Sequence, residues 1–272
     1  NLDTPILREP AVRRALARAV DREALIRDAL AGQGEPAIGP VPVQSWAYSR
    51  SPATADHDPV AAAALLTEAG WQPGPDGVRQ RDGTPLRVIL VTADTPDRLA
   101  VARTLSEQAR SVGIELIVKA VATDELFDDY LEPRSFEAAL LGQWSMGSDP
   151  DVYPQWHSSQ VGRTGGNYAG FVDPDVDRWL EVGRQESDRE LRRNAYLHFQ
   201  ARWAEAQPAI MLYHPIFSFA VARDVWGVAA DAQADSSTRL RGAVNWYRVA
   251  RPTGWQKARA IVTARALSVL GW

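Results

Sequence analysis

The 272 residues include 30 Lys and Arg and 34 Asp and Glu, which gives a formal net charge of −4, and 24% of the residues are charged. This balance is typical of a globular protein and argues against a nucleic-acid-binding protein, which needs a basic surface to displace the counterions of phosphates. The sequence contains no cysteine, which excludes disulfides, thiolate metal sites and a cysteine nucleophile.

Helix signals dominate the beginning of the chain. Apolar side chains at helical spacing predict a helix over residues 11–31 that Asp21 divides into two pieces. Asp58 followed by Pro59 predicts the N-cap and first position of another helix, which Gly70 ends. Between these two helical regions, frequent prolines and the lack of periodicity predict an irregular loop.

A strand–helix–strand unit follows. Alternating apolar residues predict strands over 86–90 and 114–118, with a helix over 96–112 between them. Such crossovers join parallel strands, so we expect a parallel sheet with helices on its faces. Turns over 72–85, with a short hairpin at Asp82-Gly83, precede this unit. The sequence therefore predicts an α/β fold.

The second half predicts further helices and short strands around one long polar connection, residues 142–170, which is rich in Gly, Ser, Asp and Trp. Asp173-Pro174 predicts the start of one helix. The capping box Ser187-x-x-Glu190 predicts the start of a longer one, to about Ala206. The other expected elements are a short helix from Thr123 to Leu131, a helix at about 151–158, and strands at 136–141, 209–213, 217–222 and 245–250.

The segment 253–270 is basic, because it carries Lys257, Arg259 and Arg265 and no acid. Its spacing predicts an amphipathic helix. Two alternatives stay open for it: a docked or frayed C-terminal helix, or a helix that binds a membrane surface or a partner. No apolar run approaches the roughly 18 residues of a membrane-spanning helix. The first residues lack the basic start and apolar core of a signal peptide, so we expect any targeting signal upstream.

Catalytic and metal-binding motifs are weak in this sequence. Its four histidines are His57, His157, His198 and His214. None has the spacing of a helical metal pair, and the nucleophile elbow and the phosphate loop are absent. Asp56-His57-Asp58 is a conceivable ligand set, but it adjoins a helix cap. Asp128-Asp129 is typical of a solvated helix face, although a two-carboxylate hydrolase stays open. We expect no cofactor, no metal and no enzymatic activity.

Five segments match one family pattern in the same order along the chain, over roughly residues 5–250. They are 12–26 (VRRALARAVDREALI), Asp58-Pro59 with 64–71 (ALLTEAGW), 105–116 from LSEQ to GIEL, 144–151 with 167–177, and 208–213 (PAIMLY). Together they resemble the family-five extracellular solute-binding proteins, the dipeptide, oligopeptide and nickel receptors of ABC importers.

The resemblance implies an α/β fold like that of the type II periplasmic-binding proteins, with one complete lobe plus the C-terminal return strands of the other. Residues 1–215 would form the C-terminal lobe, 216–250 would return to a lobe that precedes this chain, and 251–272 would be a tail. It also implies a monomeric, extracytoplasmic receptor, anchored to the membrane through an upstream segment.

Such a receptor captures a small molecule or peptide between two lobes and delivers it to a membrane permease. It has no nucleic-acid partner. A ligand-sensing or chaperone-like binding module on the same fold is the alternative to an importer receptor, beside the enzyme mentioned above.

We expect the ligand beyond the carboxyl end of the strand at 136–141, because clefts in open α/β sheets lie there. The expected ligand-binding residues are Trp144, Met146, Ser148, Asp149, Trp156, Asn167 and Tyr168. Trp144 offers an apolar plate and Ser148 offers hydrogen bonds. Asp149 fits a helix cap equally well, and the last three residues also fit a packing role.

One position departs from the family pattern. The resemblance places an aspartate of the peptide-binding members three positions after the tryptophan, where it takes the α-ammonium of the ligand; here this residue is Gly147. A buried ammonium needs a paired anion. Three alternatives follow: Asp149 supplies the anion, the other lobe supplies it, or the ligand is not a free peptide.

Overall fold

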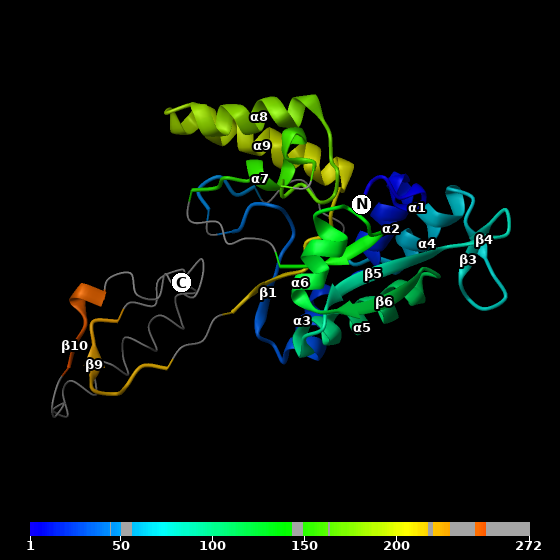
Figure 1. Cartoon of the computed structure of the whole chain (residues 1–272), viewed down its shortest axis with the longest axis horizontal. Helices are drawn as coiled ribbons and strands as arrows, with labels where there is room; N and C mark the ends of the chain where they lie inside the picture. Colours follow the sequence, from blue (N-terminus) through cyan, green and yellow to red (C-terminus); the bar gives the residue numbers. More distant parts are fainter. Residues whose placement is uncertain are drawn as a thin grey trace. The chain divides into compact units, whose positions relative to one another are not determined.

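The computed structural model describes residues 1–43, 45–49, 56–142, 149–162, 164–216, 220–228 and 243–248 (Figure 1). The chain divides into two compact units, Asn1–Ile216 and Phe217–Trp272. Among the described residues, no helix is both long enough and apolar enough to cross a membrane.

A parallel sheet with the strand order β6-β5-β7 is central to the first unit. Its strands are β5 (Arg87–Ala93), β6 (Glu115–Val121) and β7 (Ala138–Leu140), and helix α5 (Pro96–Ser111) connects the first two. Leu90 lies opposite Val118 and Ala138 in the register. The predicted parallel strand–helix–strand unit is confirmed.

The two faces of the sheet are covered differently because side chains alternate along each strand. Leu90 packs against Val101 and Leu105 of α5. Val91 points to the other face, where it packs against Leu126 and Leu131. These two leucines begin and end a π-helical turn (η1, Leu126–Leu131) that continues helix α6 (Thr123–Glu125).

The predicted N-terminal helices are confirmed, and one short helix that the sequence analysis did not predict, α1 (Pro5–Arg8), precedes them. The predicted helices are α2 (Pro10–Ala19), α3 (Arg22–Leu30) and α4 (Pro59–Glu68). Asp21 divides the first helical region and caps α3, because its carboxylate accepts a hydrogen bond of 2.9 Å from the Ala24 amide. Asp58 caps α4 in the same way, through the Ala61 amide at 2.8 Å.

Short antiparallel pairs complete the described strands of this unit. They are β2 (Gln72–Pro73), β3 (Arg79–Arg81) and β4 (Thr84–Pro85), and the separate pair β1 (Gly34–Pro36) with β8 (Tyr213–Pro215). The predicted hairpin at Asp82-Gly83 is confirmed, and both residues have the positive φ that a primed turn requires. The strand predicted at 209–213 begins only at Tyr213, because its backbone partner β1 reaches no further than Pro36.

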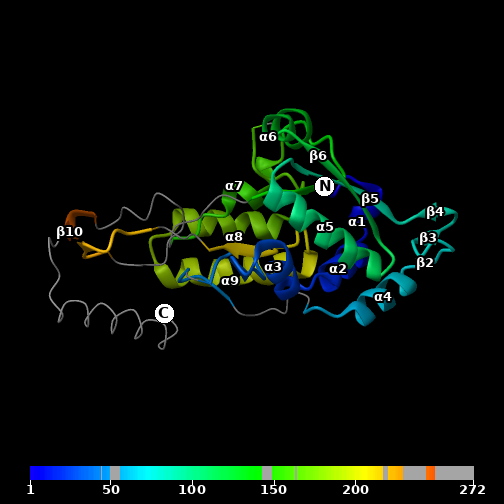
Figure 2. The ribbon, with the colours of Figure 1, turned by 90° about the horizontal axis from the view of Figure 1, so that it is seen from below.

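The described part of the long polar connection contains one short helix, α7 (Tyr153–Trp156), and a 3₁₀ turn (η2, Ser158–Gln160). Helices α8 (Pro174–Gln185) and α9 (Arg189–Ala206) then pack side by side (Figure 2). The expected capping box of α9 is wrong by one residue. Asp188, not Ser187, accepts the amides of Glu190 and Leu191, because the carboxylate of Asp188 is the stronger acceptor beside the free helix end.

Arg13 of α2 joins the beginning of the first unit to its last helix. Its guanidinium donates to the carbonyls of Leu7 (2.9 Å) and Arg8 (2.7 Å) at the end of α1. It also donates to those of Ala206 (2.7 Å) and Gln207 (3.0 Å) at the end of α9. Carbonyls at helix C-termini have no intrahelical donor and carry partial negative charge, so one cation satisfies two helix ends. Burial lowers the pKa of Arg13, which shows that the guanidinium is partly desolvated.

The second unit is described at residues 220–228 and 243–248. Strand β9 (Val225–Trp226) pairs with β10 (Tyr247–Arg248), and Arg248 forms an ion pair of 2.6 Å with Asp224. The strand expected at 217–222 is not formed at 220–222, and 217–219 lie outside the described residues. The strand expected at 245–250 is formed at 247–248, and 249–250 lie outside the described residues. The basic segment 253–270 also lies outside the described residues.

We predict that Arg13→Gln lowers the free energy of unfolding by about 2–3 kcal/mol, because carbonyls at two helix ends lose a charged donor. Arg14→Gln is the matched control, since Arg14 donates a single bond of 3.0 Å to the Glu205 carbonyl. Urea unfolding of both variants measures the difference. Equal losses in the two variants would contradict the joining role of Arg13.

We also predict that acidification weakens the first unit through His214 of β8. Burial is the largest effect and lowers the pKa of His214 below its usual 6.5, while Glu35 on the facing strand opposes it. The unfolded chain therefore binds the proton first, so stability is present above pH 6.5 and is lost as the pH falls below it. Urea unfolding from pH 7.5 to 5 should show this loss. Glu35→Gln should enlarge it and His214→Gln should reduce it; a His214→Gln profile equal to the wild-type profile would refute the assignment.

Candidate functional site

The carboxyl ends of β5, β6 and β7 meet at one edge of the sheet, which we call the carboxyl edge. Helix α5 begins at this edge with Thr95 as its N-cap, and the Thr95 side chain makes no capping hydrogen bond. A Cβ atom at Gly142 would lie 2.6 Å from a guanidinium nitrogen of Arg98, so Arg98 lies against the backbone that leaves β7. The edge therefore combines an uncapped helix start and the Arg98 guanidinium with the carboxylate of Asp97 in the first turn of α5.

Part of the expected site lies beyond what the structure describes. Trp144, Met146, Gly147 and Ser148 lie outside the described residues. The described chain resumes at Asp149, so the candidate site has two described flanks. These flanks are the carboxyl edge on one side and the residues after 148 on the other.

The segment Asp149–Asp151 is held by two arginines. Asp149 accepts from both terminal nitrogens of Arg192 on α9 at 2.6 and 3.2 Å. Asp151 accepts from Arg184 on α8 at 2.9 and 2.7 Å. The hydrogen bonds that each arginine donates to its carboxylate raise the pKa of that arginine above its usual value. The Asp149 carboxylate is therefore engaged by a cation of the protein itself.

Trp156 lies in the core between α7 and α9. It is 5% exposed, and its ring meets Trp203 edge-on at 5.4 Å and 79°. Val152, Phe199 and Leu180 belong to the same apolar cluster. The sequence leaves ligand contact and packing open for Trp156, and this buried position fits packing.

Asn167 is also buried, with 1% of its surface exposed. Its amide nitrogen donates to the carbonyls of His157 (3.1 Å) and Phe171 (2.8 Å), and its oxygen accepts from the Phe171 amide at 3.1 Å. The Asn167 side chain thus links the backbone of His157 to that of Phe171 through hydrogen bonds. This position, too, fits the structural alternative.

Tyr168 differs from these two residues because it is half-buried and packs beside the carboxyl half of the sheet. It contacts the cluster that contains Val91, Ala93 and Val121. Burial and the charge of Glu132 raise the pKa of its phenol, so the group stays neutral. Of the expected site residues that the structure describes, Tyr168 is the one whose packing places it beside the end of the strands.

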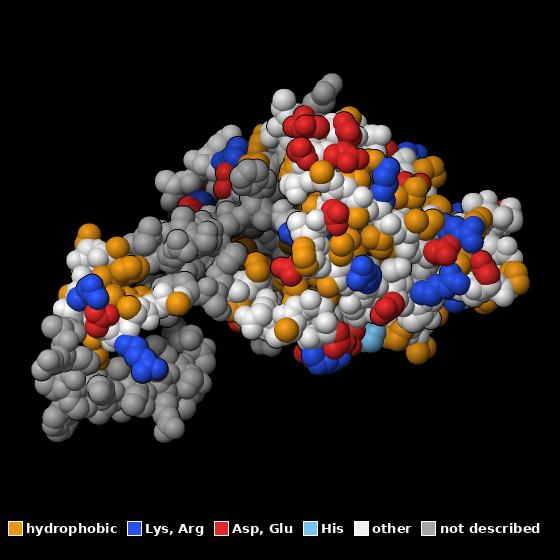
Figure 3. All heavy atoms as spheres, turned by 60° about the horizontal axis from the view of Figure 1, so that its bottom comes forward, with side chains coloured by type: hydrophobic (Ala, Val, Ile, Leu, Met, Phe, Trp, Pro, Cys, Tyr) orange, Lys and Arg blue, Asp and Glu red, His pale blue; other side chains and the backbone are white. Residues whose placement is uncertain are grey.

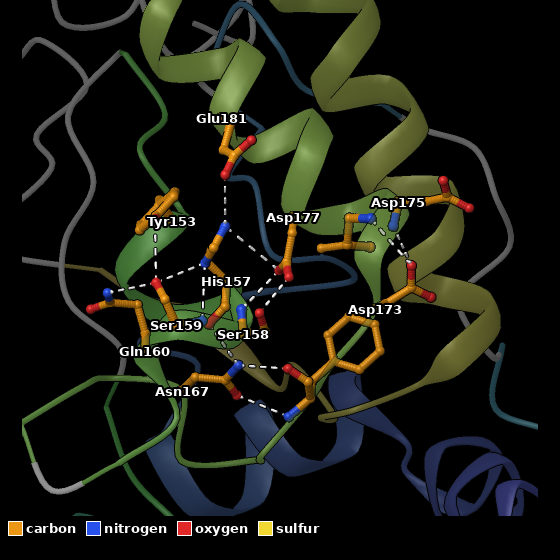
Figure 4. A network of polar contacts seen from close by, with 12 residues as sticks. Tyr153, His157, Ser158, Ser159, Gln160, Asn167, Asp173, Asp175, Asp177 and Glu181 are labelled. Carbon is orange, nitrogen blue, oxygen red and sulfur yellow. Dashed lines mark hydrogen bonds and ion pairs between the residues drawn. The ribbon is translucent and has the colours of Figure 1, made fainter.

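A polar network, missed by the sequence analysis, holds the polar connection against α8 (Figure 4). The Nδ1 atom of His157 accepts from the Ser159 amide at 3.0 Å, which assigns the proton of the neutral ring to Nε2. Nε2 lies 3.5 Å from Glu181 and 3.8 Å from Asp177. Asp177 in turn accepts from the amide (2.8 Å) and the hydroxyl of Ser158.

The signal for this network was the spacing of Asp177 and Glu181, which places two carboxylates on one face of α8. Nothing in the sequence paired them with His157. Within the described part of the chain, no group of three His, Asp or Glu side chains has the geometry to hold a metal ion. The conceivable set around His57 instead has His57 3.7 Å from Asp21.

Comparisons with known proteins now decide the family. The model of the middle region of the bacterial extracellular solute-binding proteins, family 5, matches residues 1–165. The chain belongs to this family. Protein XP55 of Streptomyces lividans is 35% identical over 247 residues, which are 90% of this chain and 43% of that protein. The oligopeptide-binding protein AppA of Bacillus subtilis is 30% identical over 220 residues, 79% of this chain and 40% of AppA.

Solved structures show the same fold. AppA in complex with a nonapeptide aligns with a TM-score of 0.74 at 26% identity, over 92% of this chain and 49% of that one. NikZ of Campylobacter jejuni in complex with Ni(L-His) aligns with a TM-score of 0.77 at 26% identity, over 91% and 50%. The predicted family and type II periplasmic-binding-protein fold are confirmed. This chain spans half the length, or less, of these relatives.

Proposed function

We propose that this chain is part of a receptor that captures a peptide or similar small ligand and delivers it to an ABC permease, and that it is not an enzyme. The alignment with peptide-bound AppA carries this proposal, because it covers almost all of this chain. NikZ with its nickel–histidine complex supports a wider range of ligands than peptides. The receptor acts outside the cytoplasm, anchored to the membrane upstream of this chain, and works as a monomer.

Residues 1–215 form one lobe of this receptor in our proposal, and 216–250 return to the other. The division of the chain at Ile216 and Phe217 supports this boundary. Hinge closure around the ligand would then produce the form that the permease recognises. On the face shown in Figure 3, one group of Asp and Glu side chains lies at the top, and Lys and Arg side chains elsewhere have acidic side chains near them, which supports a receptor without a nucleic-acid partner.

The ligand lies at the carboxyl edge in this proposal, against Trp144, Met146, Ser148 and Tyr168. Three features support that place: Trp144, Met146 and Ser148 follow β7 in the sequence, α5 begins there without a side-chain cap, and Tyr168 packs beside the strand ends. Asp149 is a poor anchor for a ligand ammonium, since Arg192 already neutralises it. The anion for a peptide N-terminus therefore comes from the other lobe, or the ligand lacks a free ammonium.

Titration calorimetry with the full-length protein tests this function. The probes are a dipeptide, a tetrapeptide, a nonapeptide and the nickel–L-histidine complex. We expect one of these classes to bind with a Kd of about 1 µM or below. Trp144→Ala should weaken that binding at least about tenfold, because the ligand loses an apolar plate.

Trp179→Ala is the matched control, because Trp179 stacks on His198 between α8 and α9. It should leave the Kd unchanged. Binding that is equally weakened by both substitutions would contradict the placement of the ligand at Trp144. Absence of binding by all four probes would contradict the proposed function.

A further inference from the structure

Along residues 149–152, alternate side chains point into the core and toward two arginines. Pro150 and Val152 are buried, and Val152 belongs to the apolar cluster of α7, α8 and α9. Asp149 and Asp151 point the other way, and each meets one arginine through two hydrogen bonds. The segment is therefore fixed from both sides as it enters α7.

Arg192 is itself held in one orientation. Its Nε donates to the carbonyl of Gly183 in the last turn of α8 at 2.8 Å, and its guanidinium lies 5.1 Å from the ring centroid of Trp46. Its side chain is 20% exposed, whereas the side chain of Asp149 is 62% exposed. The Gly183 carbonyl and the Trp46 ring thus orient the guanidinium, and Asp149 accepts from its two terminal nitrogens.

Arg184 is supported in a similar way. Its guanidinium lies 4.0 Å from the ring centroid of Tyr153, the first residue of α7. Asp151 also accepts from the amide of Tyr153 at 3.3 Å. Each arginine therefore combines two hydrogen bonds to one carboxylate with an aromatic contact, and the three contacts together restrict its side chain more than an ion pair alone does.

We propose that Arg192 and Arg184 are positioning residues for ligand capture: without touching the ligand, they fix the Asp149–Asp151 segment that leads out of the binding residues. This inference rests on the proposed function. A segment that is already in place loses less conformational entropy when the ligand binds, so the arginines raise the affinity. They are less important for the stability of α8 and α9, which share an apolar interface.

Calorimetry with the full-length protein and the tightest of the four probes tests this role. We expect Arg192→Gln and Asp149→Asn each to raise the Kd about fivefold. The double variant should raise it no further than the single ones, because both substitutions break one pair. Arg184→Gln should act in the same direction. A structural role alone would not produce this coupling in the Kd.

Arg202→Gln is the matched control. Arg202 also lies on α9 and also pairs with an aspartate, at 2.7 Å from Asp173, the N-cap of α8. The partners of Arg202 are Asp173 and Glu205, outside the Asp149–Asp151 segment. It should lower the melting temperature at least as much as Arg192→Gln and leave the Kd unchanged. Binding by the wild type with an unchanged Kd in Arg192→Gln and Asp149→Asn would overturn the positioning role alone. A wild type that binds none of the probes would overturn the proposed function and the positioning role together.

Discussion

Four backbone carbonyls converge on the guanidinium of Arg13, and the architecture of the first unit depends on this contact. Two of the carbonyls end α1 and two end α9, so one side chain joins segments that are more than 190 residues apart in sequence. A helix end that is buried without donors is costly, and neither helix brings a capping side chain of its own to these carbonyls. Because α9 is fixed in this way, α8, which packs against it, is fixed as well. Arg192 on α9 and Arg184 on α8 hold Asp149 and Asp151, so these arginines also keep their positions.

Other buried arginines follow the same principle. Arg22 donates to the carbonyls of Ala37 and Met211, and Arg79 donates to those of Val112 and Trp71. Each connects loops or helix ends that are distant in sequence, and burial lowers the pKa of each. A guanidinium suits this task because its five donors lie in a rigid plane and can serve several carbonyls at once. Cations that meet backbone carbonyls thus connect α2, α3 and β3 to helix ends and loops elsewhere in the first unit.

Local features of the sequence predicted much of this fold, and its long-range contacts were not predictable. The caps at Asp21 and Asp58 and the β5-α5-β6 unit depend on neighbouring residues, so periodicity and capping chemistry were sufficient. The capping box at Ser187 was wrong because Asp188, one position later, competes for the same amides. In the candidate site, the sequence located the polar connection. It could not show that Arg192 engages Asp149, or that Trp156 and Asn167 face inward, because these contacts depend on α8 and α9.

The central claim is that this chain forms part of a receptor whose ligand meets the carboxyl edge of the sheet. Native mass spectrometry of the full-length protein, isolated from its own cells without added ligand, tests this claim most directly. The account predicts a noncovalent complex with one peptide or other small ligand per protein, which is released on unfolding and chemically unchanged. A protein that carries no ligand under these conditions and converts a supplied peptide into products would contradict it.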